Sequence, residues 1–357
     1  MALKCVLYSH ISWAPVKGML RREKIMKKRV LVVSSANIDF VQNVDRVPYS
    51  GETIVDYNAT YQYVPGGKGA NSAIAFARFG ADCVFTCKVG ADSNGARLKS
   101  LYKAEGIDTR FMIEDKENPT GLASILVEKG GRNRIMVFPG ANGNMKAEDL
   151  EDPMTCYPDA LYLQLEIADE AVIEACRIAA EKDIPIFVDA APARFDFPLK
   201  DLGRVEIFSP NESECRVFTG IAPANEESAL RAAIRLRKMV DAKYIVIKMG
   251  EKGAFMFDGK EYFVYPPENV IPVDTTAAGD VFTAVMTYSY IQNGNIHSAI
   301  RMANVAAAIS VTRAGASTSI PTLAEVLEYR ENKKKAEAAK AEDAPSAAEA
   351  SLAEELV

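Results

Sequence analysis

Apolar runs of four to seven residues alternate along this chain with segments whose apolar residues recur at the helical period. Several runs are rich in Val, Ile and aromatic residues and lack polar alternation, which is typical of strands covered on both faces. This order predicts an α/β fold, a three-layer, doubly wound and mostly parallel sheet. The predicted strands are 30–36, 84–89, 159–165, 184–190, 205–209 and 243–249, and the predicted helices are 69–80, 94–105, 168–182, 225–240, 280–293 and 297–313.

Two regions interrupt this order and carry a period of two instead. They are residues 38–64 and 120–138, and they contain turn signals such as Pro48-Tyr49-Ser50-Gly51 and Lys129-Gly130-Gly131. The pattern predicts a small antiparallel sheet that forms a lid on the main domain. A lid of this kind can close over a substrate and exclude water. Its strand edges also invite pairing with another chain, so we expect a homodimer formed through the lid.

The two ends of the chain differ in composition from the middle. Residues 1–28 place a weakly apolar stretch before a basic cluster, the reverse of a secretory signal. We interpret them as an extension that is disordered or lies upstream of the true start. Residues 331–357 are rich in Ala, Glu and Lys, which indicates a fraying helix or a solvated tail. Residues 29–330 remain as one folded domain.

The overall composition narrows the possible chemistry. A net charge of −6 argues against nucleic-acid or anionic-membrane binding, and no apolar run approaches the ~20 residues of a membrane span. Six scattered cysteines favour buried thiols in a reducing cytoplasm. The two histidines, His10 and His297, are too few for most Ser–His–Asp, Cys–His or His-ligated metal chemistry. We therefore expect a carboxylate as general base.

The run from Val273 to Asp280, directly before an apolar helix, is the strongest candidate for chemistry. Its small residues let a ligand approach the backbone, and the first N–H groups of a helix attract phosphate because they lack intrahelical partners. Asp280 would then stand where a reacting hydroxyl must come. The alternative is a helix cap, since Asp is favoured at that position.

A second run, from Pro65 to Ala73, contains three glycines and Lys68 and leads into a predicted helix. It is neither a Walker A loop nor a dinucleotide fingerprint, because the glycine spacing fails. Its glycines would let a polyhydroxy ligand lie against the backbone, while Lys68 and Asn71 donate hydrogen bonds to it. The alternative is a helix-start turn with a solvated lysine.

Together, the runs Gly66–Asn71 and Asp274–Asp280 resemble the paired signatures of the ribokinase family of carbohydrate kinases. The resemblance covers about residues 29–330. It implies in-line transfer of the γ-phosphoryl group of ATP to a sugar hydroxyl, and it is closest to the kinases that convert ribose to ribose 5-phosphate. A nucleoside or another sugar is the alternative acceptor. Intermediate matches lie at Ser35–Asp39, Gln164–Glu166, Ala191–Arg194, Ser209–Glu214 and Arg313–Gly315.

The resemblance also implies a role for each matching residue. Asp280 would accept the hydroxyl proton beside an anion hole formed by Ala277, Ala278 and Gly279. The other implied roles are substrate binding by Asn37, Asp39, Gly66, Gly67, Lys68, Asn71 and Glu166, nucleotide binding by Asn211, Lys248, Gly250, Gly253 and Asn304, Mg²⁺ binding through water by Glu214, and binding of a monovalent cation such as K⁺ by Asp274, Thr276, Gly315 and Ser319.

Several of these residues also have an ordinary structural interpretation. Asp39 would be a strand-end turn residue, and Glu166 would be a helix N-terminal acid that complements the dipole. Asn211 and Glu214 fit a helix cap and a helix-face charge equally well. The two glycines after strand 243–249 fit a simple β-turn, and Asn304 fits a core or solvent position better than an adenine contact.

Departures from the family pattern occur at Asp189, where the ribose kinases usually have Asn, and at Lys248, where Thr or Ser is common. We expect neither residue to touch the proposed chemistry directly. Arg132 and Arg134 in the lid have two interpretations. They could bind a sugar substrate that already carries a phosphate group, or they could be ordinary solvent-exposed arginines, which is the more common case. Two other classes are a binding protein that has lost catalysis, which Asp280 argues against, and a nicotinamide-dependent oxidoreductase, which the missing fingerprint argues against.

Overall fold

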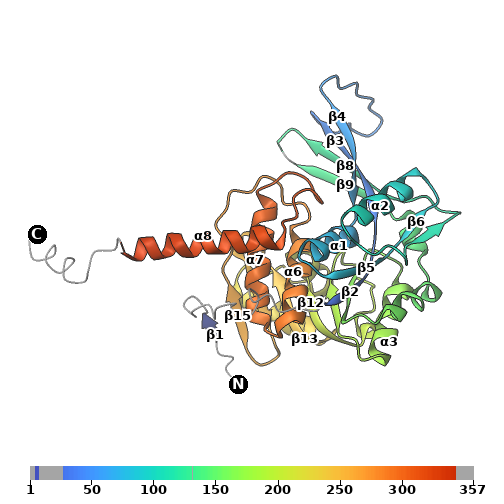
Figure 1. Cartoon of the computed structure of the whole chain (residues 1–357). Coiled ribbons are helices and arrows are strands. Elements are labelled where there is room, and N and C mark those ends of the chain that lie inside the picture. The colour runs from blue at the N-terminus through green and yellow to red at the C-terminus, as the bar shows by residue number, and fades with distance from the viewer. Residues whose placement is uncertain (1–4, 8–26, 131, 343–357) are drawn as a thin grey trace, which may run out of the picture.

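A nine-stranded sheet forms the centre of the computed structural model, which describes residues 5–7, 27–130 and 132–342. The strand order is β1-β15-β14-β13-β12-β11-β10-β2-β5 (Figure 1). The strands from β5 to β13 in this order run parallel, whereas β14 is antiparallel to both neighbours. The strands are β1 (Cys5–Leu7), β2 (Arg29–Val33), β5 (Asp82–Thr86), β10 (Ala160–Gln164), β11 (Ile186–Asp189), β12 (Arg204–Ser209), β13 (Asp241–Lys248), β14 (Ala254–Phe257) and β15 (Tyr262–Tyr265).

The two faces of this sheet belong to two separate apolar cores. Along β2, Val30 and Val32 enter one core while Leu31 and Val33 enter the other, because successive side chains of a strand point to opposite faces. Covering both faces explains the unbroken apolar runs and completes the three layers. The first core includes α1 (Lys68–Arg78), α2 (Ser93–Ala104), α6 (Ala278–Asn293) and α7 (Ile296–Val311), and the second includes α3 (Asp169–Glu181), α4 (Glu212–Thr219) and α5 (Glu226–Arg237).

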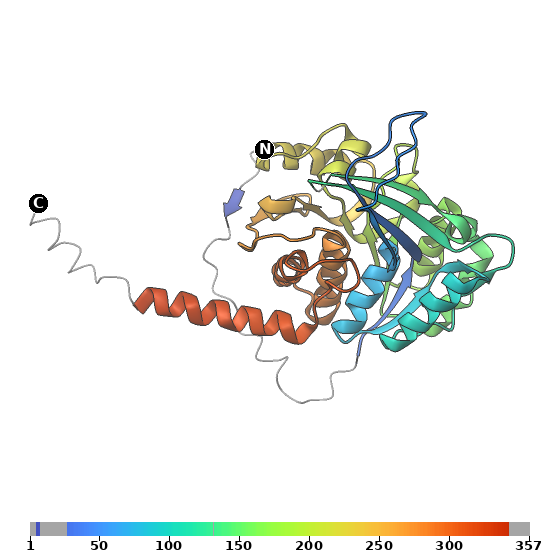
Figure 2. The same ribbon diagram turned by 90° about the horizontal axis from the view of Figure 1, so that it is seen from above.

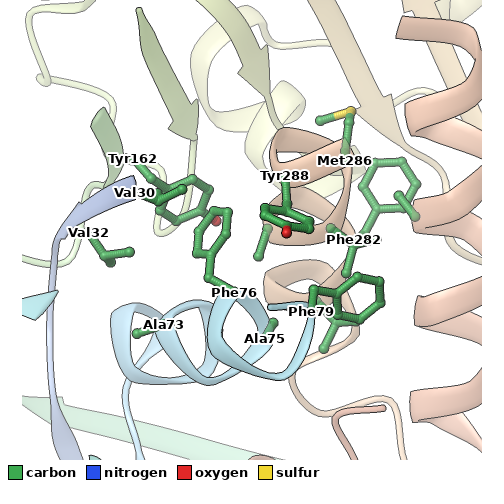
Figure 3. Packing of buried hydrophobic residues seen from close by; sticks show 14 of the residues in the cluster. Val30, Val32, Ala73, Ala75, Phe76, Phe79, Tyr162, Phe282, Met286 and Tyr288 are labelled. Carbon is green, nitrogen blue, oxygen red and sulfur yellow. The ribbon is translucent and has the colours of Figure 1, made fainter. Parts of the chain in front are cut away.

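Helices α1 and α6 pack against each other inside the first core (Figure 3). Phe76 projects from α1 toward Tyr162 and Tyr288, and Phe79 projects toward Phe282 of α6 (Figure 3). Tyr162 of β10 meets Phe76 edge-on, with ring centroids 5.1 Å apart. Each fully buried side chain of this size contributes about 1.5–3 kcal/mol. This packing holds the starts of α1 and α6, which carry the two small-residue runs, beside each other.

A separate sheet with the order β4-β3-β8-β9 projects from the main body as a lid (Figures 1 and 2). Its strands are β3 (Asn37–Val44), β4 (Thr60–Gly66), β8 (Gly121–Glu128) and β9 (Asn133–Phe138). The outer pairs are antiparallel, but β3 and β8 run parallel. The lid is therefore mixed rather than wholly antiparallel, because the two antiparallel pairs meet along strands that run in the same direction.

Every predicted strand and helix of the main domain has a counterpart, with its ends shifted by a few residues. The predicted strand 84–89 is divided between β5 and β6 (Lys88–Gly90), and β6 pairs with β7 (Ile113–Asp115). The sequence pattern did not predict α4, β14 or β15. Helix α8 (Leu323–Glu342) runs past residue 331, so the first part of the predicted tail is helical (Figure 1).

Most of the predicted N-terminal extension lies outside the described residues, as do residues 343–357. Of residues 1–28, the structure describes only 27–28 and strand β1, which pairs parallel with β15 at the edge of the main sheet. None of the helices in the described ranges combines the length and the apolar character needed to span a membrane.

Candidate active site

Polar side chains converge where the parallel strands end. Gln164, Asp189 and Lys248 are the last residues of β10, β11 and β13. Asn71 lies near the start of α1, and Asp280 lies in the first turn of α6. Ligands of open α/β sheets bind at the carboxyl ends of the strands. The fold therefore brings both sequence runs to the expected edge of the sheet.

Asp280 is buried in the first turn of α6, and it does not cap the helix. The N-cap position belongs to Ala277. Asn71 Nδ2 donates to Asp280 Oδ2 at 2.9 Å, and Gln164 Nε2 donates to Oδ1 at 3.2 Å. Burial raises the pKa of Asp280 to about 7, against the opposing effect of the Lys68 ammonium group. The cap interpretation is wrong, and the proton affinity suits a base that works near neutral pH.

The start of α6 carries backbone N–H groups that no side chain caps. Ala277 holds the left-handed conformation with φ of 63°, and Ala278 N reaches the Thr275 carbonyl oxygen only at 3.3 Å. Unpartnered N–H groups and the helix dipole both favour a phosphate oxygen at such a position. The predicted anion hole of Ala277, Ala278 and Gly279 is thus adjacent to the Asp280 carboxylate.

Asp39 and Glu166 act on each other electrostatically near the base of the lid. Glu166 Oε2 accepts a hydrogen bond from the Lys68 backbone N at 3.1 Å and another from the Ser35 hydroxyl. Burial and then the Glu166 charge raise the pKa of Asp39 to about 6, while Lys68 opposes this shift. Asp39 lies inside β3, paired with Val64, so it is not a turn residue. Glu166 precedes α3 and is not among the acids of its first turn.

Asn71 leaves one buried polar atom available to a ligand. Its Nδ2 donates a hydrogen bond to Asp280, whereas its Oδ1 has no hydrogen-bond partner among the described residues. A buried unpaired carbonyl oxygen costs about 1–3 kcal/mol. A hydroxyl that donates to Asn71 Oδ1 would recover that cost, and it would stand beside Asp280.

Asn37 and Asn142 form a contact that sequence reasoning missed. Asn142 Nδ2 donates to Asn37 Oδ1 at 2.8 Å and to the Ala36 carbonyl oxygen at 3.0 Å, and its Oδ1 accepts from Ala36 N at 3.0 Å. Asn142 therefore fixes the backbone where β3 begins. The only signal in the sequence is an Asn in a Gly-rich segment after the lid, which is weak on its own.

The glycines of the second run are required mainly by neighbouring protein atoms. A Cβ on Gly66 would lie 2.2 Å from the Asp39 carboxyl group, and Gly67 has φ of 95° with the Asn37 backbone N at 2.8 Å from an added Cβ. Side chains rarely adopt that φ. We expected these glycines to open space for a ligand, but they primarily let α1 begin against β3. They contribute to the substrate site by allowing Asp39 its position.

The comparisons with known proteins agree with this arrangement. The model of the pfkB family carbohydrate kinases matches residues 27–323. The chain belongs to this family.

Individual relatives support the same assignment. Over 311 residues the kinase is 35% identical to ribokinase of Haemophilus influenzae, covering 86% of this chain and 100% of the relative. It is 34% identical over 298 residues to ribokinase of Mus musculus, covering 82% and 91%. The structure of Arabidopsis thaliana ribokinase complexed with ribose and ATP is similar with a TM-score of 0.76 at 29% identity, covering 85% and 98%. The predicted ribokinase-like fold is confirmed, and the oxidoreductase interpretation is wrong.

Asp189 and Lys248 of this kinase form a buried ion pair beside Asp280. Lys248 Nζ donates to Asp189 Oδ1 at 2.5 Å, and only 10% of the Lys248 side chain is exposed. Gln164 Nε2 lies 3.4 Å from Asp189 Oδ2 as well as 3.2 Å from Asp280 Oδ1. Neither residue is hydrogen-bonded to the Asp280 carboxylate, but the Gln164 side chain joins the ion pair to it.

Asn211 and Glu214 form a capping box at the start of α4. Glu214 Oε2 accepts from Asn211 N at 2.7 Å, and Glu214 N donates to Asn211 Oδ1 at 2.8 Å. Glu214 is buried, which excludes a plain exposed helix charge. Burial raises its pKa, against the opposing charge of Lys248. This buried carboxylate faces the site, so it suits a water-mediated Mg²⁺ contact, although the described residues hold no metal-binding cluster of three or more His, Cys, Asp or Glu.

The remaining predicted nucleotide residues have structural partners of their own. Gly250 begins a short 3-10 turn after β13, and a Cβ on Gly253 would lie 2.0 Å from the Tyr265 carbonyl oxygen. Asn304 Nδ2 donates to the Pro266 carbonyl oxygen at 3.1 Å. The turn interpretation therefore accounts for both glycines without a nucleotide, and Asn304 fastens the loop after β15.

The residues predicted to bind a monovalent cation lie in two segments, one before α6 and one after α7, which Asp274 joins through a hydrogen bond from Gly315. Asp274 Oδ1 accepts from Thr276 N at 2.9 Å, and Asp274 Oδ2 accepts from Gly315 N at 2.9 Å. Burial raises the pKa of Asp274, but the hydrogen bonds from Thr276 and Gly315 lower it overall. Ser319 is buried, and its hydroxyl donates to the Ala316 carbonyl oxygen. The Asp274 carboxylate is the one anionic group among these residues, which suits a weakly held cation.

Arg132 and Arg134 both pair with Glu128 in the lid. The closest nitrogen–oxygen distances are 3.4 Å and 3.9 Å, and both arginine side chains are largely exposed. Exposure to solvent and pairing with Glu128 therefore account for these two arginines without a phosphorylated sugar substrate.

Proposed function

We propose that this carbohydrate kinase transfers the γ-phosphoryl group of ATP to D-ribose and produces ribose 5-phosphate. The buried Asp280 carboxylate carries the proposal, because it is held by Asn71 and Gln164 directly beside uncapped N–H groups of α6. A base and an anion hole thus meet at one point. The ribokinases of Haemophilus influenzae and Mus musculus, and the Arabidopsis thaliana ribokinase complexed with ribose and ATP, support ribose as the acceptor.

Asp280 acts in this proposal as the general base. A bond forms between the sugar hydroxyl oxygen and the γ-phosphorus, the bond from the γ-phosphorus to the oxygen of ADP breaks, and the hydroxyl proton passes to Asp280. The transition state is loose, so positioning and charge stabilisation supply most of the catalysis. The N–H groups of Ala277, Ala278 and Gly279 stabilise the transferring phosphoryl group. With a pKa of about 7, a large fraction of Asp280 is ionised at physiological pH.

The sugar is held by the residues at the base of the lid. Asp39 and Glu166 accept hydrogen bonds from hydroxyl groups, and Asn71 Oδ1 accepts one from a hydroxyl beside Asp280. Lys68 balances the negative charge of these carboxylates. The lid sheet closes over the bound sugar and excludes water from the phosphoryl group.

Two kinds of cation complete the proposal. Mg²⁺ supplies positive charge that the phosphate oxygens of ATP need, and Glu214 would contact its water ligands. K⁺ would be held by Asp274 and by oxygen atoms near Thr276, Gly315 and Ser319, where it stabilises the loop that leads into α6. Asn211, Lys248, Gly250, Gly253 and Asn304 line the route proposed for the nucleotide.

A second copy of the chain is proposed to pair through the lid in the cytoplasm. The outer strand β9 presents exposed apolar side chains, among them Ile135, Met136 and Phe138, and Tyr61 of β4 is also exposed. An exposed apolar strand at a sheet edge is a site for pairing with another chain. Light scattering tests this: a mass of one chain would overturn the dimer.

The test of the activity is ADP release with ribose, 2-deoxyribose, fructose, nucleosides and phosphosugars as acceptors, each with and without K⁺. Turnover with ribose at the highest kcat/KM is the expected result. Turnover with a nucleoside but none with ribose would overturn the proposed substrate while leaving the kinase assignment intact. Activity that is indifferent to Mg²⁺ or to K⁺ in ion-free buffer would overturn the corresponding site.

A further inference from the structure

The ion pair between Asp189 and Lys248 lies directly beneath the start of α6. Besides its contact with Asp189, Lys248 Nζ lies 3.3 Å from Thr283 Oγ1, and Thr283 Oγ1 donates to the Gly279 carbonyl oxygen at 3.1 Å. The same Nζ lies 3.8 Å from the position that a Cβ on Gly279 would take. The pair therefore touches α6 from below, and Gln164 joins it to the Asp280 carboxylate from the side.

We propose that Asp189 and Lys248 act as one positioning pair, which sets the orientation and the charge state of Asp280 and supports the anion hole. The proposal rests on the role of Asp280 as base. The pair places two opposite buried charges behind the proposed base.

Gln164 connects the ion pair to Asp280 geometrically. Gln164 has one amide group, and its Nε2 is shared between Asp189 at 3.4 Å and Asp280 at 3.2 Å. Ser34 Oγ donates to Gln164 Oε1 at 2.9 Å and so fixes which end of the amide faces the two acids. Because Lys248 holds Asp189, the Gln164 amide is kept where it also donates to Asp280, and Ser72 Oγ is a third neighbour of Nε2 at 3.4 Å. The orientation of the base thus depends on the ion pair.

The ion pair also acts on Asp280 electrostatically. The charged groups that act on Asp280 are Lys68 from α1, Asp189 from β11 and Lys248 from β13. Glu214 from α4 acts on both lysines, and Glu166 acts on Lys68. With Asp189 and Lys248 both present, their effects on Asp280 oppose each other. Removing one member leaves an uncompensated buried charge, which interacts strongly at low dielectric.

The two single variants are therefore expected to shift the pKa of Asp280 in opposite directions. In Lys248→Met the unpaired Asp189 carboxylate disfavours ionisation of Asp280, and the acidic limb of the kcat/KM profile moves up by about one pH unit. In Asp189→Asn the freed Lys248 favours ionisation of Asp280, and the limb moves down by a similar amount. The double variant Asp189→Asn/Lys248→Thr is expected to return the limb to within a few tenths of a pH unit of the parent.

The control is the ion pair between Lys88 and Asp149, whose lysine is as buried as Lys248, although Asp149 is more exposed than Asp189, and whose nitrogen–oxygen distance is 2.9 Å. Neither Lys88 nor Asp149 is among the groups that act on Asp280, so Lys88→Met is expected to leave the acidic limb of the kcat/KM profile unchanged. Loss of folding in Lys248→Met would not remove the test, because in Asp189→Asn the Lys248 ammonium group still has the charges of Asp280 and Glu214 to offset it, so we expect that variant to fold.

A second readout separates this inference from the proposed function. The titration of the Asp280 carboxyl carbon, followed by NMR in protein labelled at Asp carboxyl groups and assigned with Asp280→Asn, requires no turnover. Opposite shifts in the two single variants support the positioning pair even if ribose is not the acceptor. Equal titration in the parent and Asp189→Asn, or shifts in the same direction, would overturn it. Shifts by NMR without matching shifts in kcat/KM would overturn only the role of Asp280 as base.

Discussion

The buried base carries a stability cost that a single substitution should reveal. Asp280 is 7% exposed, and its pKa in the folded protein is about 7 against an ordinary value of 3.8. Because the folded-state pKa lies above the unfolded one, this group favours the fold only when it is protonated. That contribution is complete below pH 3.8 and is lost as the pH rises through 7. Asp280→Asn keeps the shape of the protonated acid and removes the charge.

The magnitude follows from the two pKa values of Asp280. At pH 8 they correspond to about 4 kcal/mol, and at pH 5 to about 2 kcal/mol, by linkage between proton binding and unfolding. The new amide would face the Nδ2 group of Asn71, but that side chain can rotate so that its unpartnered Oδ1 accepts instead. We therefore expect Asp280→Asn to be more stable than the parent, by about twice as much at pH 8 as at pH 5.

Urea unfolding at pH 5 and pH 8 measures this difference, with Asp152→Asn as an exposed control outside the site. The same variant should lose about 10²–10⁴-fold in kcat while it still binds ATP. A stability gain that does not grow between pH 5 and pH 8 would refute the buried-charge reasoning. Parent-like turnover would refute the assignment of Asp280 as the base.

Three further outcomes are expected. Because the pKa of Asp39 is about 6, the KM for ribose should rise as the pH falls through 6, whereas the fall in kcat over the same range comes from protonation of Asp280. Asp39→Asn should raise KM by about 10–100-fold and abolish the pH dependence of KM but not that of kcat; a flat KM profile in the parent would contradict this. Ala277→Gly should stabilise the fold by about 0.5–1 kcal/mol by relieving the left-handed backbone at φ of 63°, yet lower kcat because the anion hole becomes less rigid; thermal unfolding and ADP release measure the two effects, and an unchanged kcat would remove Ala277 from the anion hole. Asp274→Asn should abolish activation by K⁺ and leave Mg²⁺ dependence unaltered in steady-state assays, and retained K⁺ activation would place the cation elsewhere.

Much of the fold was predictable because its strands are short, apolar and buried on both faces. Along β2, four successive apolar residues alternate between the two cores. Because both faces of the strand are buried, the sequence shows an unbroken apolar run there. The lid was also predictable, since period-two segments with turn signals cannot fit a doubly buried sheet. The parallel pairing of β3 with β8 was not, because strand order depends on contacts between segments about eighty residues apart.

The candidate site was predictable where its residues lie within one short run, and not where they meet across the sheet. Asp280 stood out because small residues precede it. Gln164 and Asn142 did not, since each acts on a partner more than one hundred residues away in the chain. Glu214 was ambiguous because a capping box and a buried acid have the same sequence, and only the structure shows that one side chain serves as both.

The arrangement around Asp280 explains why a carboxylate can serve as base in a protein with so few histidines. An exposed aspartate near pKa 4 is ionised but a weak proton acceptor, whereas complete burial without partners would keep it protonated. Here burial raises the pKa while Lys68, Asn71 and Lys248 restrain the rise, and the balance lies at about 7. The glycine-rich run contributes both Lys68 and Asn71 to this balance, so the two sequence runs are coupled through a single titrating group. A change in either run should therefore alter the pH at which the kinase works as well as its affinity for the sugar.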